Sequence, residues 1–428
     1  MNSDKPNSKS KSDKEQNIYF DDLDFDDRLL DALYDMHFEK CTPIQAKAIP
    51  QILRGKDLIG LAQTGTGKTA AYLLPILSKL CNCPYQQKYI KCLIIVPTRE
   101  LAQQIDQAVD GFSYYLPISS VAIYGGNDGL RYEKERKGLS QGADIVIATP
   151  GRFLSHIQLG NVNLSKLSFF ILDEADRMLD MGFIDDIMQI IKKIPLQCQK
   201  LLFSATMPTK IQQLAKEILH NPIEIKIAIS QPSEKISQKA VFCCDRQKIE
   251  LIQHLFKKIP PHKVIIFSSS KQSVKELTMS LKQKKYRAQD MHSDLSQKER
   301  NFTMNSFKAQ QINILVATDI VSRGIDIEDL QMVINYDIPH HAEDYIHRIG
   351  RTARAGKGGL AFSLVNEKDF YYFRQIEKLQ QKKIEVLDLP EQLGKSPSFT
   401  IEPNKHKKNL KQSRKSTKKK TIVKTIEV

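Results

Sequence analysis

Two series of short apolar runs constrain the fold of this 428-residue chain more than any other feature of its sequence. Runs such as CLIIVP (92–97), FFILDE (169–174) and NILVAT (313–318) alternate with longer stretches of helical pattern. Nearly uninterrupted apolar runs are typical of strands that are covered on both faces in a parallel sheet. The expected strands are 57–62, 92–97, 120–126, 144–150, 169–174 and 200–206, then 240–244, 263–270, 287–291, 313–318, 332–337 and 360–365. The sequence therefore predicts an α/β fold.

A polar stretch, AISQPSEKISQK (228–239), separates the two series and predicts two domains. We expect the first domain at 18–228, a linker at 229–239 and the second domain at 240–392. Ligands are expected where loops leave the carboxyl ends of the strands. Residues 1–17 and 393–428 have few apolar residues and predict disordered tails.

The net charge of +15 favours a polyanionic partner, and its distribution is uneven. From Ser396 to the C-terminus, ten Lys and Arg residues oppose only Glu402 and Glu427. This tail is either a solubilising segment or a basic arm that binds phosphates nonspecifically. We favour the nucleic-acid interpretation.

The sequence shows no apolar run of membrane-spanning length and no secretory signal, so we expect a cytoplasmic protein without membrane contact. Its seven cysteines lack zinc-ligand spacing. The histidines at 340, 341 and 347 do not form an obvious metal site either.

The segment AQTGTGKT (62–69) follows one expected strand and precedes an apolar helix, which is the context of a phosphate-binding P-loop. Gly65 and Gly67 allow backbone N–H groups to surround phosphates at a helix N-terminus. Lys68 would reach the β- and γ-phosphates, and Thr69 would ligate Mg²⁺. The alternative is a plain glycine turn. The residues expected to bind ATP here are Gln63, Thr64, Gly65, Thr66, Gly67, Lys68 and Thr69.

Three carboxylates end the apolar run FFILDEADRMLD, at Asp173, Glu174 and Asp176. Buried carboxylates need a positive partner or hydrogen bonds. In a P-loop enzyme, a second strand ends in an Asp that holds Mg²⁺, and a neighbouring acid can orient the attacking water. Asp173 fits the first role and Glu174 the second, whereas the alternative is a solvated acidic loop.

Over residues 18–390 the chain resembles the DEAD-box RNA helicases, because its motifs stand in the order of that family. These are TPIQ (42–45), the P-loop, PTRELAQQ (97–104), GG (125–126), TPGR (149–152), DEAD (173–176), SAT (204–206), ATDIVSRGIDI (317–327) and YIHRIGRTARAG (345–356). The resemblance implies two tandem RecA-like domains and a Mg²⁺- and ATP-dependent RNA helicase.

The family resemblance also implies a reaction and a cellular role. The enzyme would unwind short RNA duplexes locally or remodel RNA–protein complexes, and it would act as a monomer. The short flanks and the lysine-rich tail look most like the bacterial RhlE-like group. That group implies roles in ribosome assembly or RNA turnover, with ribosomal precursor particles or RNA-decay proteins as partners.

The same resemblance gives Phe20 a stacking role on adenine and gives Gln45 a hydrogen bond to its edge. An amide suits adenine because it offers one donor and one acceptor. Alternatively, TPIQ only begins a helix, with Thr42 as cap and Pro43 in the first position. Both interpretations can hold together.

Contacts to the RNA backbone are implied for two sets of residues. The first domain supplies Thr98, Arg99, Gly126, Thr149, Gly151 and Arg152, and the second supplies Thr318 and Arg323. Without the resemblance, turn and cap chemistry and surface arginines would explain these motifs equally well.

The remaining implied roles concern coupling and catalysis. Ser204 and Thr206 would hydrogen-bond Asp176, and His347 would link this group to the second domain. Arg351 and Arg354 would meet the γ-phosphate, and Asp326 would bind the ribose. Arg348, Arg351 and Arg354 recur at a spacing of three, so a solvated basic helix face is the alternative.

Three positions depart from the family pattern: His37 and Ala353 replace common glycines, and Cys41 replaces a common proline. Three other functions stay open: an ATP-dependent RNA clamp that separates few strands, a DNA helicase, and a kinase or signalling ATPase. The motif around Gln45 argues against the DNA helicase, and the arginine-rich motif argues against the kinase.

Overall fold

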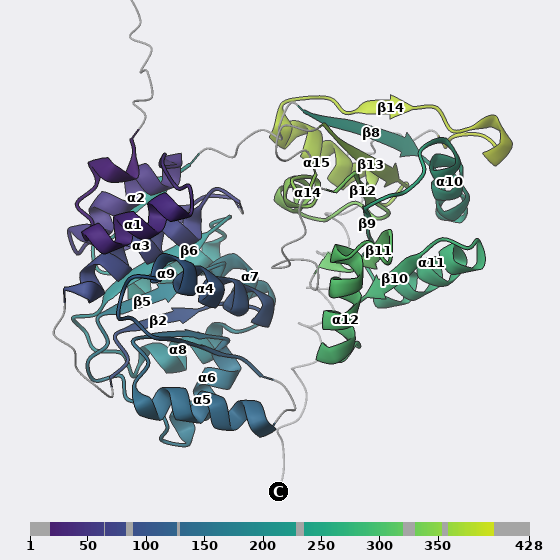
Figure 1. The fold of residues 1–428 in the computed structure, drawn as a ribbon. Helices are drawn as coiled ribbons and strands as arrows, with labels where there is room; N and C mark the ends of the chain where they lie inside the picture. Colours follow the sequence, from purple (N-terminus) through teal and green to yellow (C-terminus); the bar gives the residue numbers. More distant parts are fainter. Residues whose placement is uncertain are drawn as a thin grey trace, which may run out of the picture. The chain divides into compact units, whose positions relative to one another are not determined.

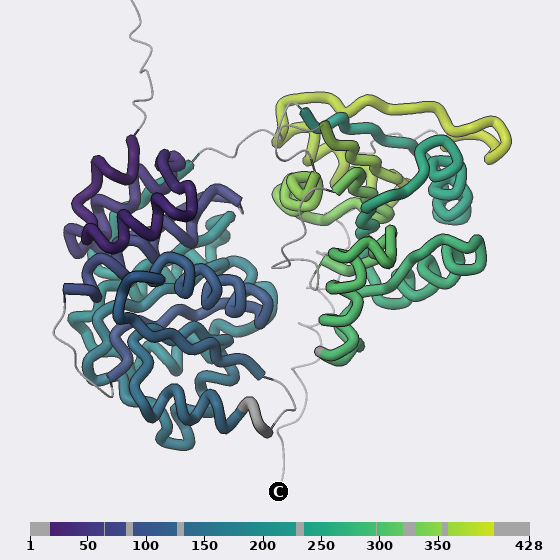
Figure 2. Tube along the Cα trace, in the orientation of Figure 1, coloured from purple at the N-terminus to yellow at the C-terminus, as the bar shows by residue number. Residues whose placement is uncertain are grey.

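The computed structural model describes residues 18–63, 65–82, 89–125, 129–227, 235–319, 330–352 and 358–397 (Figures 1 and 2). The chain divides into two compact units. The first consists mainly of residues up to Gln231, and the second consists mainly of the residues that follow. Among the described residues, no helix combines the length and apolarity that a membrane crossing requires.

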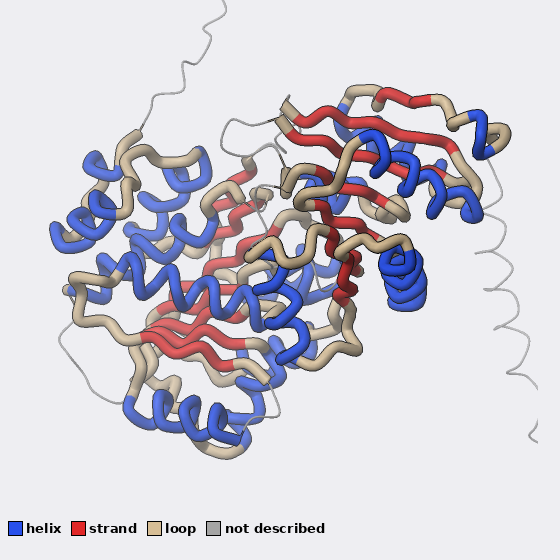
Figure 3. Tube along the Cα trace, turned by 45° about the vertical axis from the view of Figure 1, so that its right-hand side comes forward, coloured by secondary structure: helices blue, strands red, loops and turns tan. Residues whose placement is uncertain are grey.

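The first unit contains one seven-stranded sheet in the order β3-β4-β2-β5-β6-β1-β7, and all its strand pairings are parallel. The strands are β1 (Leu58–Leu61), β2 (Cys92–Ile95), β3 (Ser120–Ile123), β4 (Ile145–Ala148), β5 (Phe169–Leu172), β6 (Gln199–Ser204) and β7 (Ile223–Lys226). Helices lie on both faces of the sheet (Figure 3). The predicted parallel α/β fold is confirmed for this unit.

The helices of the first unit connect these strands. They are η1 (Phe20–Asp22), α1 (Asp27–Asp35), α2 (Pro43–Leu53), α3 (Lys68–Cys81), α4 (Arg99–Phe112), α5 (Gly129–Gln141), α6 (Pro150–Gln158), α7 (Ala175–Asp180), α8 (Ile184–Ile191) and α9 (Thr209–Ile218). Helix α2 packs beside α3, the helix that follows the P-loop (Figure 1).

Burial on both faces explains why the central strands read as uninterrupted apolar runs. Along β5, Phe169 and Ile171 belong to one buried cluster, whereas Phe170 and Leu172 belong to the cluster on the opposite face. Because successive strand residues point to opposite faces, every position of such a strand must be apolar.

The second unit repeats the plan with the order β10-β11-β9-β12-β13-β8-β14, again with all pairings parallel. Its strands are β8 (Ile236–Phe242), β9 (Val264–Phe267), β10 (Ala288–Met291), β11 (Ile314–Ala317), β12 (Met332–Asn335), β13 (Gly359–Val365) and β14 (Glu385–Leu387). Its helices are α10 (Asp245–Lys258), α11 (Lys271–Gln283), α12 (Gln297–Lys308), α14 (Ala342–Ile349), α15 (Phe370–Gln380) and η2 (Glu391–Leu393). The two-domain α/β prediction is thus confirmed.

Three strands differ from the prediction. The edge strands β7 and β14 were not predicted, because their short segments IEIK and EVL mix charged and apolar residues. Strand β8 already begins at Ile236, so the end of the expected linker is part of the sheet.

The expected tail also begins too early. Leu393 accepts a hydrogen bond from Gln247 at 2.7 Å, and the Ser396 hydroxyl donates to the Phe242 carbonyl at 2.9 Å. These contacts attach residues 393–396 to the second unit. The predicted tails at 1–17 and from 398 onward lie outside the described residues.

Candidate nucleotide and RNA site

The P-loop lies between the end of β1 and the start of α3. Gly65 and Gly67 both have positive φ angles, 82° and 89°, which glycine adopts without strain. A Cβ atom at Gly67 would lie 2.4 Å from Gln45 Nε2. The loop therefore needs glycine at this position for both its backbone conformation and its close approach to α2. Thr64 lies outside the described residues.

Internal hydrogen bonds hold the loop in shape. The Lys68 ammonium is buried and donates to the Ala62 carbonyl at 2.9 Å, and the Thr66 hydroxyl donates to the Gln63 carbonyl at 2.7 Å. The buried Gln63 Nε2 has no hydrogen-bond partner among the described residues. An acceptor such as a phosphate oxygen at the loop would satisfy this donor.

Asp173 follows β5 and is 2% exposed. Its Oδ2 accepts a hydrogen bond from the Tyr72 hydroxyl at 3.0 Å, and its Oδ1 accepts one from the Glu174 N–H at 2.9 Å. Burial raises the pKa of Asp173 to about 6, although nearby Lys68 opposes this shift. The Tyr72 hydroxyl also contacts Thr69. Tyr72, which the sequence did not single out, thus connects the P-loop helix to Asp173.

The oxygen atoms near Asp173 suit a cation that a nucleotide helps to bind. Among the described residues, no group of three or more His, Cys, Asp or Glu side chains could hold a metal by itself. Mg²⁺ in nucleotide enzymes takes one or two protein oxygens and completes its coordination with phosphate and water. The Asp173 carboxylate and the Thr69 hydroxyl fit such a set.

Glu174 has a φ of 54°, in the left-handed region that residues other than glycine rarely adopt. Its carboxylate accepts a hydrogen bond from Arg177 at 3.0 Å. Such conformations are concentrated at functional sites. The spacing of three residues to Arg177 was a signal that sequence reasoning missed. Whether Glu174 orients water stays a prediction.

Asp176 makes the predicted contacts to the segment after β6. Its Oδ2 accepts hydrogen bonds from the Thr206 N–H at 2.8 Å and from the Thr206 hydroxyl at 2.9 Å. Its own N–H donates to Ser204 Oγ at 3.2 Å. The three acids therefore have different surroundings, and the solvated acidic loop is wrong for Asp173. The coupling role of this group stays a prediction.

Gln45 binds protein groups at both ends of its amide. Its Oε1 accepts from the Thr42 N–H at 2.8 Å, and its Nε2 donates to the Gly67 carbonyl at 3.2 Å. Thr42 caps α2 and Pro43 is its first residue, so the helix-start alternative describes the local structure. The amide retains one donor and one acceptor position for a base edge.

Phe20 is buried in the structure, and its stacking on adenine stays a prediction. Its ring is 1% exposed and packs in the core with Phe38, at 6.2 Å between ring centroids. Because other side chains cover its faces, stacking on adenine would require η1 to move.

The candidate RNA residues of the first unit lie at helix starts that follow adjacent strands. Thr98 caps α4, where its hydroxyl accepts from the Leu101 N–H at 3.3 Å, and Thr149 stands at the same position before α6. A Cβ atom at Gly125 would lie 3.6 Å from the Arg99 side chain, so the GG motif lies close to the PTRELAQQ motif. Gly151 and Arg152 occupy the first turn of α6. Gly126 lies outside the described residues.

These motifs share the carboxyl edge of one sheet with the P-loop. Strands β4, β2, β5, β6 and β1 are consecutive neighbours and parallel. Ser204 is the last residue of β6, and the other motif residues at that edge follow strand ends: Thr149, Thr98, Asp173 and Ala62. The motifs that are expected to bind ligands thus gather at one edge of the sheet, and their contacts to ligands stay a prediction.

In the second unit, Arg348 is a structural residue. It is 4% exposed and donates to the Asp319 carboxylate at 2.7 Å, to Asn335 Oδ1 at 3.0 Å and to the Asp337 carbonyl at 2.8 Å. The solvated basic face is therefore wrong for this arginine. His347 lies on α14 and Arg351 in the turn that follows it. Thr318 directly follows β11 and is buried, whereas Arg323, Asp326 and Arg354 lie outside the described residues.

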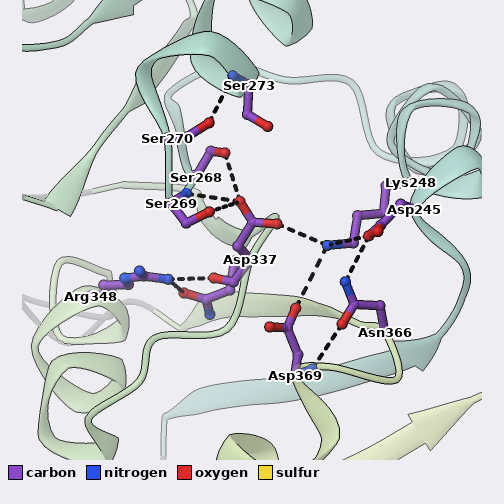
Figure 4. Close-up of polar contacts among 11 residues, drawn as sticks. Asp245, Lys248, Ser268, Ser269, Ser270, Ser273, Asp337, Arg348, Asn366 and Asp369 are labelled. Carbon is purple, nitrogen blue, oxygen red and sulfur yellow. Dashed lines mark hydrogen bonds and ion pairs between the residues drawn. The ribbon is translucent and has the colours of Figure 1, made fainter. Parts of the chain in front are cut away.

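Figure 4 shows a second network that sequence reasoning missed. Lys248 is 1% exposed, and its ammonium lies 2.9 Å from Asp337, 3.3 Å from Asp245 and 3.7 Å from Asp369. Burial alone would raise the pKa of Asp337, but Lys248 and donors from Ser268 and Ser269 lower it. Burial raises the pKa of Asp369 to about 6. This network fixes the loops after β12 and β13.

Comparison with protein families finds matches over most of both units. Residues 42–214 match the family described as DEAD/DEAH box helicase, and residues 247–356 match the helicase conserved C-terminal domain. The ATP-dependent RNA helicase CshA of Listeria monocytogenes is 40% identical over 372 residues, which cover 87% of this chain and 70% of that protein. The DEAD-box ATP-dependent RNA helicase RhpA of Helicobacter pylori is also 40% identical over 372 residues, with 87% and 74% covered.

Solved structures agree with these matches. S. cerevisiae Dbp5 bound to RNA and ADP BeF3 is 30% identical, with a TM-score of 0.75, and the match covers 86% of this chain and 95% of that one. Mss116p bound to ssRNA and AMP-PNP is 30% identical, with a TM-score of 0.78 and coverage of 89% and 82%.

Proposed function

We propose that this chain, which belongs to the DEAD/DEAH box helicase family, is an RNA-stimulated ATPase that unwinds short RNA duplexes locally or remodels RNA–protein complexes. The observation that best supports this proposal is the shared sheet edge of the first unit. There, Asp176 hydrogen-bonds Thr206 and Ser204 beside the buried Asp173. A change at the nucleotide site can thus reach the neighbouring loops through direct contacts.

ATP would bind at the P-loop, with its phosphates at the start of α3. Lys68 would donate to a phosphate oxygen through one of its two remaining N–H groups, and Gln63 would gain an acceptor. Gln45 would offer its remaining amide positions to the adenine. When bound, Mg²⁺ would neutralise phosphate charge, and Asp173 and Thr69 would hold it.

Glu174 would accept a proton from the attacking water once its carboxylate leaves Arg177. Arg351 and Arg354 would stabilise the charge that develops on the transferred phosphoryl group, a role worth about 10³–10⁵ in rate in other phosphoryl-transfer enzymes. Asp326 would hold the ribose and His347 would contact the Asp176 group. Since these residues lie in both units, hydrolysis would require the two units to close around ATP.

RNA would contact the first unit through Thr98, Arg99, Gly126, Thr149, Gly151 and Arg152. The second unit would add Thr318 and Arg323. Hydroxyls, helix starts and arginines recognise phosphates without reading bases. RNA and ATP that both favour the closed state would strengthen each other's binding. Because the contacts are to phosphates and not to bases, we expect only a weak preference for particular RNA sequences.

The proposal also includes a cellular role. We propose roles in ribosome assembly or RNA turnover in the cytoplasm, with the protein acting as a monomer. The support is general: the relatives are named as RNA helicases, and the C-terminus is rich in lysine. Membership of the RhlE-like group stays a prediction.

The ATPase of Glu174→Gln, measured with and without single-stranded RNA, tests the chemistry. We expect RNA to stimulate the wild type and the substitution to lower turnover about 10²- to 10⁴-fold, because it removes the general base. RNA affinity with a nonhydrolysable ATP analogue should be retained. Normal turnover in the variant would contradict the role of Glu174.

Strand displacement on a short RNA duplex tests the outcome of that chemistry. ATP-dependent displacement supports a helicase, whereas RNA binding and hydrolysis without displacement would identify an RNA clamp. Equal stimulation by DNA and RNA would contradict the RNA specificity.

A further inference from the structure

Glu135 is a buried carboxylate beside one of the expected RNA-binding residues. It lies on α5 and is 2% exposed. Its Oε2 accepts a hydrogen bond from Arg152 Nε at 2.7 Å and lies 3.1 Å from His156 Nε2. Its Oε1 accepts from the Tyr124 N–H at 3.2 Å. Burial alone would raise the pKa of Glu135, but these donors lower it, so the group is ionised.

The surrounding side chains fix the orientation of this carboxylate. The Asn161 amide nitrogen lies 3.3 Å from His156 Nδ1 and donates to the Tyr132 hydroxyl at 3.2 Å. Because an amide nitrogen can only donate, His156 Nδ1 must be the acceptor. The proton of a neutral His156 is then on Nε2, which donates it to Glu135.

Arg152 is held on two sides. Its Nε is bound to Glu135, and its guanidinium lies over the Tyr132 ring, 4.9 Å from the centroid. Tyr132 in turn stacks on the buried His156 ring, at 5.0 Å and an interplanar angle of 10°. The two terminal amino groups of Arg152 make no hydrogen bond within the described part of the chain.

We propose that Glu135 is a positioning residue, which holds Arg152 by Nε so that both terminal amino groups can bind one phosphate of the RNA backbone. A guanidinium binds a phosphate best through two parallel hydrogen bonds, and this geometry requires a fixed plane. Glu135 and Tyr132 define that plane before RNA arrives, which reduces the entropy lost on binding. This inference rests on the proposed contact between Arg152 and RNA.

Charge repulsion and the proposed positioning role predict opposite effects of Glu135 on RNA affinity. This difference makes the inference testable. A carboxylate near RNA repels phosphates, so its removal should strengthen binding. If Glu135 instead positions Arg152, its removal should weaken binding, despite the gain of one unit of positive charge.

The experiment measures the affinity of the full chain for single-stranded RNA, with a nonhydrolysable ATP analogue at fixed salt. Glu135→Gln should weaken binding about 3- to 10-fold, and Arg152→Ala about 10-fold or more, as expected for hydrogen bonds to charged groups. Arg152→Lys keeps the charge but loses the planar fork, so binding should fall with little change in salt dependence. Adding Glu135→Gln to Arg152→Lys should produce no further loss.

Glu133→Gln is the matched control. Glu133 lies on the same helix, is exposed and pairs only with Arg136 among the described residues. This substitution removes the same charge and should leave RNA affinity unchanged or slightly increased. Glu135→Gln should lower the thermal midpoint, because it removes the charge of a buried, hydrogen-bonded network, so RNA affinity is compared at a temperature where every variant is fully folded. ATP affinity without RNA checks that the nucleotide site is intact.

Three results would overturn the inference: tighter RNA binding by Glu135→Gln, an equal loss in the Arg152→Lys background, or wild-type affinity of Arg152→Lys. If Arg152→Ala itself binds RNA normally, the proposed contact of Arg152 fails, and the positioning role fails with it. A loss in Arg152→Ala combined with tighter binding by Glu135→Gln rejects the positioning role alone.

Discussion

Gly67 has the tightest local constraint in the candidate site. Its φ is 89°, and a Cβ atom there would lie 2.4 Å from Gln45 Nε2 and 3.1 Å from Thr42 Oγ1. Gly67→Ala should therefore combine a left-handed conformation, which costs about 1–2 kcal/mol, with a displacement of the Gln45 amide. We expect lower stability against urea and weaker ATP binding.

Gly55 offers a matched control for that substitution. Its φ is 75°, but no atom lies within 4 Å of the position that a Cβ atom would take there. Gly55→Ala should show the conformational cost alone, with normal ATP affinity. Equal effects of the two substitutions would contradict the importance of the Gly67–Gln45 approach.

Asp173 should make stability depend on pH. Its pKa is raised from 3.8 to about 6, so the ionised carboxylate is less favourable in the folded protein than in the unfolded chain. The cost is absent below pH 3.8, grows between the two pKa values and is complete above about pH 6. Asp173→Asn should therefore stabilise the metal-free protein at pH 8, by up to roughly 3 kcal/mol, and have little effect at pH 4. Urea unfolding of both proteins with a chelator, across this pH range, measures the difference; a constant difference would contradict the shift.

At the scale of elements, Lys248 connects α10 to the loops after β12 and β13 (Figure 4). Lys248→Met would leave three carboxylates around an apolar side chain. Removing one partner of a buried ion pair costs about 3–5 kcal/mol. Because the chain has no tryptophan, hydrogen exchange of peptides from β12 and β13 is a suitable measurement, and we expect their protection to fall.

Lys275→Met is the control for this prediction. Lys275 also pairs with an Asp, at 3.2 Å from Asp294, but both side chains are almost half exposed. Exposed pairs contribute about 0–1 kcal/mol, so protection should change little. Equal effects of the two lysines would show that the buried network is not stabilising.

The elements also show which parts of the fold the sequence can predict. Central strands such as β2 and β5 are buried on both faces and appear as apolar runs, whereas β7 and β14 have one neighbour and carry exposed charged residues. Motif spacing places Asp176 beside Thr206 because both follow adjacent strands. Partners such as Tyr72 for Asp173 and Asp337 for Lys248 are 101 and 89 residues apart, and no local pattern identifies them. The burial of Phe20 was not foreseen, because an aromatic side chain can pack in a core as well as stack on a base.

At the scale of the whole molecule, charge is concentrated toward the C-terminus. Ser396 contacts the second unit, so a truncation after Pro397 removes the basic segment and preserves that contact. If the segment binds phosphates, RNA affinity should fall and its dependence on salt should become shallower, because fewer counterions are released. Replacing the ten Lys and Arg residues by Gln at constant length is the control and should have the same effect. An unchanged affinity and salt slope would leave only the solubilising interpretation.

The hydrogen bond between Lys68 and Ala62 has a consequence for turnover. The Ala62 carbonyl accepts one hydrogen bond from the ammonium at 2.9 Å, and the ammonium has two further donors for a phosphate. The carbonyl therefore holds the ammonium at the loop before a nucleotide arrives, which reduces the side-chain entropy lost on binding. Because this bond does not depend on the ligand, Lys68 keeps its position when the product departs. The loop is then ready for the next nucleotide without rebuilding its charged group.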